Sequence, residues 1–159
     1  MTLLTRKVDY ALLILSYLCH RSEGASAREI AAAFEGLSRS FAANILKELC
    51  QQGFVTSHRG AKGGYVLQRP AEEISLLELM DSLDDSVHVA ECNKTAKDDF
   101  CSLLSVCPMR NAIGQVHQRV REVLSNVTVA ELFPPGGHGA SGVQYGLELL
   151  PLEQQLAMP

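Results

Sequence analysis

The sequence contains no apolar run that reaches the length needed to span a bilayer. It also lacks the small-residue cleavage site that would follow the charged start of a signal peptide. These two absences predict a protein of the cytoplasm, which is a reducing compartment. The 159 residues are 47% hydrophobic, a share typical of a globular protein, and their number suggests one domain with appendages.

The chain has only five cysteines, which cannot all pair, and a disulfide framework is disfavoured without secretion. Cys92, Cys101 and Cys107 lie close together in the sequence, whereas Cys19 and Cys50 lie far away in apolar helical patterns. Thiolates bind soft metals and iron–sulfur clusters, so the first three form part of a candidate ligand set. The polar, charged stretch between Cys92 and Cys101 predicts a loop that a bound metal or cluster could order.

The whole chain has no excess of positive charge, since its formal net charge is −4, and this alone argues against nucleic-acid binding. The distribution is uneven, however. Residues 1–70 hold nine Lys or Arg and five Asp or Glu, whereas residues 71–159 hold five and thirteen. A local basic face is sufficient to attract phosphates, so the first half is the candidate nucleic-acid interface.

Apolar residues at helical spacing predict a first helix over residues 5–20. Ser26 and Glu29 have the spacing of a capping box that begins a second helix, which Gly36 ends. A third helix, capped by Ser38 or Ser40, follows almost at once. Two short helices joined by a tight glycine turn are typical of a helix-turn-helix.

In a helix-turn-helix the second helix enters the major groove with its N-terminal residues. The side chains left on the outer face of that helix suit base edges and phosphates, and they are Arg39, Ser40, Asn44 and Lys47. The alternative is that these residues form only a solvated helix face.

Two strands are predicted over residues 54–57 and 64–68, with the basic, glycine-rich turn 58–63 between them. A hairpin that follows a helix-turn-helix is typical of a wing, whose tip would bring His58, Arg59 and Lys62 to the DNA. An ordinary hairpin is the alternative. The pattern does not match a phosphate-binding P-loop, because no Lys-Ser or Lys-Thr follows the glycines and no helix is predicted to begin there.

Residues 70–73 are predicted to be a linker and residues 74–83 a short helix. After Pro108, a long helix over residues 109–126 has a narrow apolar stripe at near-heptad spacing, which predicts a partner helix, although the stripe could pack on its own domain alone. The stripe consists of Met109, Ile113, Val116, Val120, Val123, Leu124 and Val127. Thr128 and Glu131 predict a last helical turn.

Together these pieces resemble the winged-helix, iron–sulfur-sensing transcriptional regulators of bacteria typified by IscR, NsrR and RirA. The resemblance spans residues 1 to about 133. It rests on TRKVDYA at 5–11, the segment 37–55, RGAKGGY at 59–65, the three cysteines, and NVTVAEL at 126–132. It implies a mainly α fold with a small β-hairpin wing, a winged helix-turn-helix and a long dimerisation helix.

The resemblance also implies a homodimer with one 2Fe–2S or 4Fe–4S cluster per subunit, bound by Cys92, Cys101 and Cys107. Some of these regulators add a histidine three residues after the last cysteine, where this chain has Arg110. Others add an aspartate from the N-terminal helix of the other subunit, a position that Asp9 matches. Asp9 could instead be a favourable charge at the helix start or part of a salt bridge. A glutamate that some relatives carry on the recognition helix is here Ala43, so their sequence preference does not carry over.

The leading hypothesis is therefore a transcriptional regulator, most simply a repressor, that binds a palindromic operator as a homodimer and whose cluster senses cluster status, nitric oxide or redox stress. A zinc-stabilised dimer or metal-binding module is the alternative. An enzyme is disfavoured, because neither His88 nor His117 has a recognisable cysteine partner and no serine triad is present. The expected organisation is a DNA-binding domain at 1–84, a cluster loop at 85–108, a dimerisation helix and terminal turn at 109–133, and a flexible tail at 134–159.

Overall fold

The computed structural model describes residues 4–58, 63–83, 86–93, 101, 103 and 105–134. The predicted tail after residue 134 and the wing-tip residues Arg59 and Lys62 lie outside these ranges. The elements in chain order are α1 (Arg6–Cys19), α2 (Ala27–Ala33), α3 (Arg39–Gln51), β1 (Val55–His58), β2 (Gly64–Leu67), the 3-10 turn η1 (Ala71–Glu73), α4 (Leu76–Ser82), the 3-10 turn η2 (Glu91–Asn93), α5 (Arg110–Asn126) and α6 (Val129–Leu132).

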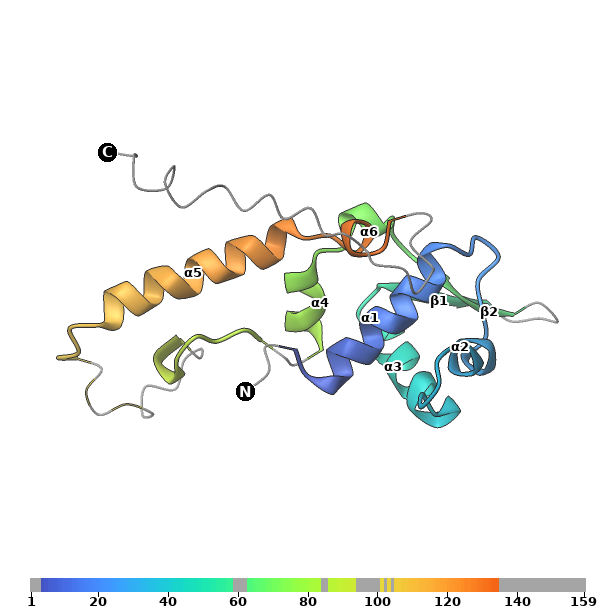
Figure 1. The fold of residues 1–159 in the computed structure, drawn as a ribbon, viewed down its shortest axis with the longest axis horizontal. Helices are drawn as coiled ribbons and strands as arrows, with labels where there is room; N and C mark the ends of the chain where they lie inside the picture. Colours follow the sequence, from blue (N-terminus) through green and yellow to red (C-terminus); the bar gives the residue numbers. More distant parts are fainter. Residues whose placement is uncertain are drawn as a thin grey trace.

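Helices dominate, and β1 and β2 form a two-stranded antiparallel hairpin (Figure 1). The predicted fold class is thus confirmed. Within the described ranges, no helix is both long and apolar enough to cross a membrane.

The short-range signals read from the sequence set the starts of α2 and α3 as predicted. The backbone N–H of Glu29 donates to Ser26 Oγ at 3.2 Å, and the Ser26 N–H donates to Glu29 Oε2 at 2.7 Å, which completes the capping box. Ser38 is the residue that caps α3, since its Oγ accepts from the Phe41 N–H at 3.2 Å. Helix α2 ends at Ala33, earlier than predicted, so Gly36 lies in the following turn; its φ of +89° is a left-handed conformation that glycine adopts without steric cost.

The hairpin is held against the loop before α2. Tyr65 on β2 exchanges two backbone hydrogen bonds with Ala25, at 2.8 and 3.0 Å. This approach is so close that a Cβ on Gly64 would lie 2.7 Å from the carbonyl carbon of Ala25. Glycine at this position therefore allows the hairpin to pair with the helix-turn-helix and fixes its direction.

Two predicted boundaries are wrong around the start of α4. The predicted linker 70–73 contains the turn η1, whose Ala71 is buried. The predicted helix 74–83 begins only at Leu76, because Ile74 and Ser75 are extended and pair with residues 127–129. The Leu76 N–H donates to the Val127 carbonyl and the Val129 N–H to the Ile74 carbonyl, both at 2.8 Å.

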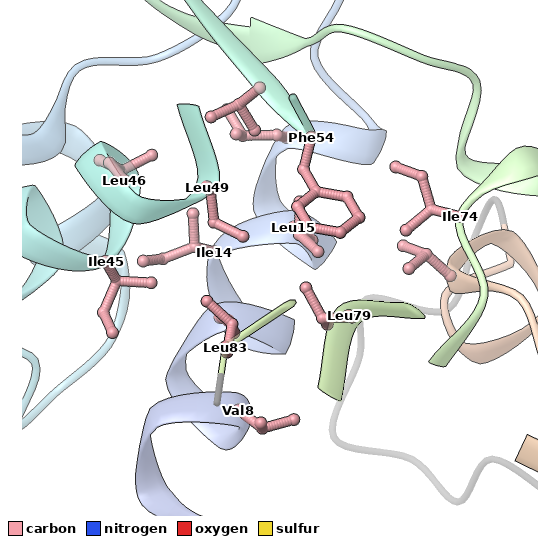
Figure 2. Close-up of a cluster of buried hydrophobic side chains, with 14 of the residues drawn as sticks. Val8, Ile14, Leu15, Ile45, Leu46, Leu49, Phe54, Ile74, Leu79 and Leu83 are labelled. Carbon is pink, nitrogen blue, oxygen red and sulfur yellow. The ribbon is translucent and has the colours of Figure 1, made fainter. Parts of the chain in front are cut away.

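One hydrophobic core lies between α1, α3, α4 and the residues that follow α3 and β2 (Figure 2). Ile14 and Leu15 on α1 face Leu46 and Leu49 on α3, and Phe54, just before β1, is fully buried among them. Burying a side chain of this size contributes about 2 kcal/mol relative to leaving it exposed. The core therefore fixes α3 on α1 and leaves the opposite face of α3 in solvent.

Helix α5 contacts the DNA-binding fold through its C-terminal half, and the turn η2 contacts it further toward its N-terminus. Leu124 is the one residue of α5 that is buried, and Arg121 makes a bidentate ion pair with Asp81 on α4, at 2.8 and 3.3 Å. Further toward its N-terminus the stripe is uncovered, with Val116 45% and Met109 60% exposed. In Figure 1 this end of α5 projects away from the other helices.

Candidate functional site

The exposed face of α3 carries the four side chains predicted to contact DNA. Arg39, Ser40, Asn44 and Lys47 are all exposed. The opposite face, formed by Ala42, Ile45, Leu46 and Leu49, is buried and sets the rotation of the helix. Because Arg39 and Ser40 lie in the first turn of α3, this arrangement has the geometry by which a recognition helix presents its N-terminal residues to a groove.

Phe41 lies on this face as well, and reasoning from the sequence missed it. Its side chain is 36% exposed, and its ring meets the ring of Tyr10 on α1 edge to face, with centroids 5.0 Å apart. An aromatic ring held in this way is able to contact a thymine methyl group. The signal in the sequence is that Phe41 falls off the buried face defined by Ala42, Ile45 and Leu49.

The hairpin is the second part of the candidate interface. His58 is exposed, but it is the last residue of β1, paired with Gly64, rather than part of the predicted turn 58–63. Arg59 and Lys62 belong to the stretch that the structure does not describe, so their contribution stays a prediction. The pairing of Tyr65 with Ala25 fixes the direction of the hairpin relative to α2 and α3.

The cysteine segment lies at the other end of the molecule from the hairpin (Figure 1). Cys92 is part of η2 and is exposed, whereas Cys101 and Cys107 are partly buried, and all three thiols are free. Among the residues with described positions, no three His, Cys, Asp or Glu side chains form a group close enough to hold a metal ion. The structure therefore does not bring the three cysteines together. Their chemistry still fits a soft metal or cluster, because thiolates are the ligands such groups prefer.

An open groove of about 470 Å³ lies beside Cys92, between η2 and the first turns of α5. Its lining includes Arg110, the residue at the position where some similar regulators have a ligating histidine. A guanidinium is not a metal ligand, because it stays protonated and has no lone pair to offer. The remaining lining residues are Asn93, Asn111, Gly114, Gln115 and Gln118.

Asp9 lies in the first turn of α1 and is exposed. No ion pair to Asp9 is seen within the described ranges, so the salt-bridge alternative finds no support there. Asp9 also joins no metal-sized group in the part of the chain that the structure describes. Its carboxylate is accessible from solvent.

His88 and His117 contact each other, a pairing that reasoning from the sequence did not predict. Their rings stack with centroids 6.0 Å apart and an interplanar angle of 15°, and His88 Nδ1 lies 3.1 Å from the carbonyl oxygen of Asn93. The pair thereby connects the start of the cysteine segment to α5. Nδ1 of His117 is buried without a hydrogen-bond partner in the described structure. Desolvation, together with the nearby Arg121 and His88, lowers the pKa of His117.

The two isolated cysteines, Cys19 and Cys50, have thiols of low reactivity. Burial, with a smaller contribution from the charge of Glu72, raises the pKa of the Cys19 thiol to about 11, and burial also raises the pKa of Cys50. A thiol with a raised pKa stays protonated near neutral pH and is a poor nucleophile or ligand. This agrees with assigning no catalytic role to either residue.

Comparisons with known proteins agree with this architecture. The family model Rrf2, described as an iron-dependent transcriptional regulator, matches residues 4–135. Protein aau3 of Rhizobium meliloti (strain 1021) is 35% identical over 130 residues, which are 81% of this chain and 83% of that protein.

Three solved structures from bacteria are also similar. CymR (YrzC), the global cysteine regulator of B. subtilis, has 26% identity and a TM-score of 0.63, over 83% of this chain and 96% of that chain. CymR of Staphylococcus aureus has 28% identity and a TM-score of 0.61, over 82% and 97%. IscR of T. potens has 27% identity and a TM-score of 0.59, over 81% and 84%. The chain therefore belongs to the Rrf2 family of DNA-binding transcriptional regulators, which are not enzymes.

Proposed function

We propose that this protein is a homodimeric repressor whose affinity for DNA is controlled by an iron–sulfur cluster, which senses cluster status, nitric oxide or redox stress. The observation that carries the proposal is the position of three free thiols in one segment, between the DNA-binding fold and α5. The match to a family described as iron-dependent supports iron as the metal. In this proposal residues 1–84 read DNA, 85–108 hold the cluster and 109–133 form the dimer.

The DNA-reading part consists of α3 and the hairpin. Arg39, Ser40, Asn44 and Lys47 would contact base edges and phosphates in the major groove, and His58, Arg59 and Lys62 would contact the adjacent backbone or minor groove. A dimer carries two such surfaces, which must match half-sites about one helical turn apart. A palindromic operator is the expected target.

The cluster would be held by Cys92, Cys101 and Cys107, with Asp9 of the partner subunit as the fourth ligand. When bound, the cluster supplies a redox-sensitive and nitric-oxide-sensitive group that holds these residues together. The chain's own contribution is to supply the donors and to join their segment to α5 through the His88–His117 stack. A segment that is ordered in one state and released in the other has two arrangements, as control of DNA affinity from a distance requires.

The dimer would form along the stripe of α5. Val116, Val123 and Met109 are 45%, 63% and 60% exposed in the single chain, which leaves apolar surface on one face of a helix. A parallel or antiparallel α5 from a second copy would cover this face at near-heptad spacing. Such an arrangement brings the two copies together in the half of the chain that is not basic.

Charge deletions test the DNA-reading surface. Arg39→Ala and Arg59→Ala should each weaken binding to an operator duplex and reduce the salt dependence of the affinity by about one counterion, because each removes one phosphate contact. Fluorescence anisotropy at several salt concentrations measures both effects. Arg119→Ala is the matched control, since Arg119 is exposed on α5 in the other half of the chain.

Equal losses for all three variants would indicate a general charge effect and refute a localised interface. Unchanged binding for Arg59→Ala alone would remove the hairpin tip from the proposed interface and leave α3 in it.

The role of Asp9 is tested by Asp9→Ala. If Asp9 is a cluster ligand, the substitution should alter the visible spectrum of the reconstituted protein. The apo protein should still form dimers. Glu23→Ala, at an exposed position between α1 and α2, is the matched control and should leave the spectrum unchanged. A wild-type spectrum for Asp9→Ala would return Asp9 to a structural role at the start of α1.

A further inference from the structure

Lys7, in the first turn of α1, contacts two elements that are far apart in the sequence. Its Nζ lies 2.8 Å from Glu48 Oε2 on α3, which is the proposed recognition helix. The same Nζ donates to the backbone carbonyl of Leu83, the residue that caps the C-terminus of α4, at 3.4 Å. One ammonium group therefore connects α3 with the end of α4.

The end of α4 is where the chain leaves the DNA-binding fold toward the cysteines. Leu83 is 2% exposed and belongs to the same buried cluster as Val8 on α1 (Figure 2). Val87 is 5% exposed in that cluster, and η2 with Cys92 follows. The end of α4 is therefore the part of the DNA-binding fold that is closest along the chain to the cysteine segment.

The Leu83 carbonyl oxygen is a favourable partner for a cation. The last carbonyls of a helix have no donor within the helix and form its partially negative end, so a lysine ammonium there is favourable. A shift of this carbonyl changes the electrostatic environment of the Lys7 ammonium and, through it, the ion pair with Glu48. Glu48 directly follows Lys47, one of the side chains proposed to contact DNA.

The hydrophobic packing alone gives a less specific connection. Helix α3 packs mainly on α1, α2 and β1, whereas α4 packs mainly on α5. Core contacts between these elements are non-directional, because apolar burial depends on area rather than on orientation. The Lys7 contacts are directional and involve charge, so they respond to a small displacement of either partner.

From this geometry we infer that Lys7 is a positioning residue that couples the cysteine segment to the recognition helix α3. This inference rests on the proposed cluster control and specifies how that control reaches the DNA-binding surface. Lys7 itself need not touch DNA or the cluster. The contrary view is that Lys7 and Glu48 form an ordinary partly exposed ion pair, whose loss would lower stability slightly and leave regulation intact.

The two views differ in one ratio, the dissociation constant for operator DNA of the apo dimer divided by that of the holo dimer. Lys7→Met should move this ratio toward one by about two- to fivefold, the range that a partly exposed ion pair is able to supply. Lys7→Arg keeps the charge and the donors and should retain the wild-type ratio. Any direct effect of the mutation on DNA affinity appears in both states and cancels.

Glu48→Gln and Glu78→Gln form a matched pair for the acceptor side. Glu78 on α4 accepts from Arg69 at 2.7 Å and has a side-chain exposure of 42%, close to the 2.8 Å and 38% of Glu48. In the described part of the chain, the ion-pair partner of Glu78 is Arg69, which lies outside α3. Glu48→Gln should move the ratio toward one as Lys7→Met does, whereas Glu78→Gln should leave it at the wild-type value.

A wild-type ratio for Lys7→Met would overturn the inference. An equal change of the ratio in Glu78→Gln and Glu48→Gln would also overturn it, because the loss of any ion pair would then have the same effect. A wild-type protein whose ratio is already one would instead refute cluster control. In that case, hydrogen exchange on the apo dimer tests the link between Lys7, α3 and α4 independently of the cluster. DNA binding at α3 should slow exchange in the last turn of α4 in the wild type and not in Lys7→Met, and equal protection in both would overturn the link.

Discussion

The DNA-binding fold and the part of the chain after it differ in how much of their hydrophobic surface is buried. From α1 to Leu83, apolar side chains are buried in one core, and Phe41 is the large apolar residue there that remains exposed. After Leu83 the described chain has only Val87, Leu124 and Val129 among its buried hydrophobic residues, and its exposed apolar residues include Val116 and Val123.

This difference shows which part of the described structure is complete as a single chain. The first region buries its own surface and holds its elements in place. The second offers an uncovered helix face and three thiols that are not gathered into a site. In the proposed function a second copy covers the helix face, and a metal or cluster gathers the thiols. The second region is thus the one expected to respond to a signal.

The largest expected effect comes from placing a charge on the uncovered face of α5. Val116→Asp should weaken self-association by about 100-fold or more, because each copy would bury an unpaired carboxylate in the interface. Gln118→Asp introduces the same charge on the opposite, solvated side of the helix and is the control. Analytical ultracentrifugation over a range of protein concentrations measures both. Equal association of the two variants would place the dimer interface elsewhere.

A second test compares packing in the two regions. Gly64→Ala should lower the free energy of unfolding by about 1–3 kcal/mol, because its Cβ would lie 2.7 Å from the backbone of Ala25. Gly114→Ala on α5 meets nothing within 4 Å and should raise it by about 0.5–1 kcal/mol, since alanine is a better helix former. Urea unfolding gives both values. A loss of stability at both positions would mean that α5 is more tightly packed than the single chain indicates.

The smallest effect concerns pH and the contact between the two regions. The pKa of His117 is below its ordinary value of 6.5, because its ring is desolvated and lies near Arg121 and His88, which outweigh the opposite effect of Asp81. A lowered pKa means that the folded state binds fewer protons than the unfolded state. The stacked contact is therefore at full strength above the unfolded pKa and weakens as the pH falls below it.

His117→Phe keeps an aromatic ring in the stack and removes the titrating group. The free energy of unfolding should then fall less steeply between about pH 7 and about pH 5 than in the wild type. His58→Gln removes a histidine from the exposed end of β1, away from the stack, and is the control. An identical slope for all three proteins would exclude the His88–His117 stack as a pH-sensitive contact.

The sequence predicted the elements whose signals are local. The capping box of Ser26 and Glu29, the cap of Ser38 and the left-handed glycine Gly36 each depend on neighbours a few residues away, and all three are present. The stripe of α5 and the exposed face of α3 follow from helical periodicity, which is also local.

The features that escaped prediction depend on contacts between distant residues. The start of α4 was placed two residues too early because the pairing of Ile74 with Val129 is not visible in either segment. The stack of His88 on His117 and the contact of Lys7 with Leu83 have the same origin. The arrangement of the three cysteines depends on residues 94–100, which lie outside the described ranges, and on any group that binds them.

The central claim is that the three cysteines hold an iron–sulfur cluster, and the most direct test is the absorbance spectrum of the protein purified without oxygen, together with its iron and sulfide content. We expect visible absorption bands with matching amounts of iron and sulfide, and their loss in the variant Cys92→Ala. A colourless, iron-free protein that takes up zinc instead would contradict the claim. It would leave a winged-helix regulator whose DNA affinity is not controlled by a cluster.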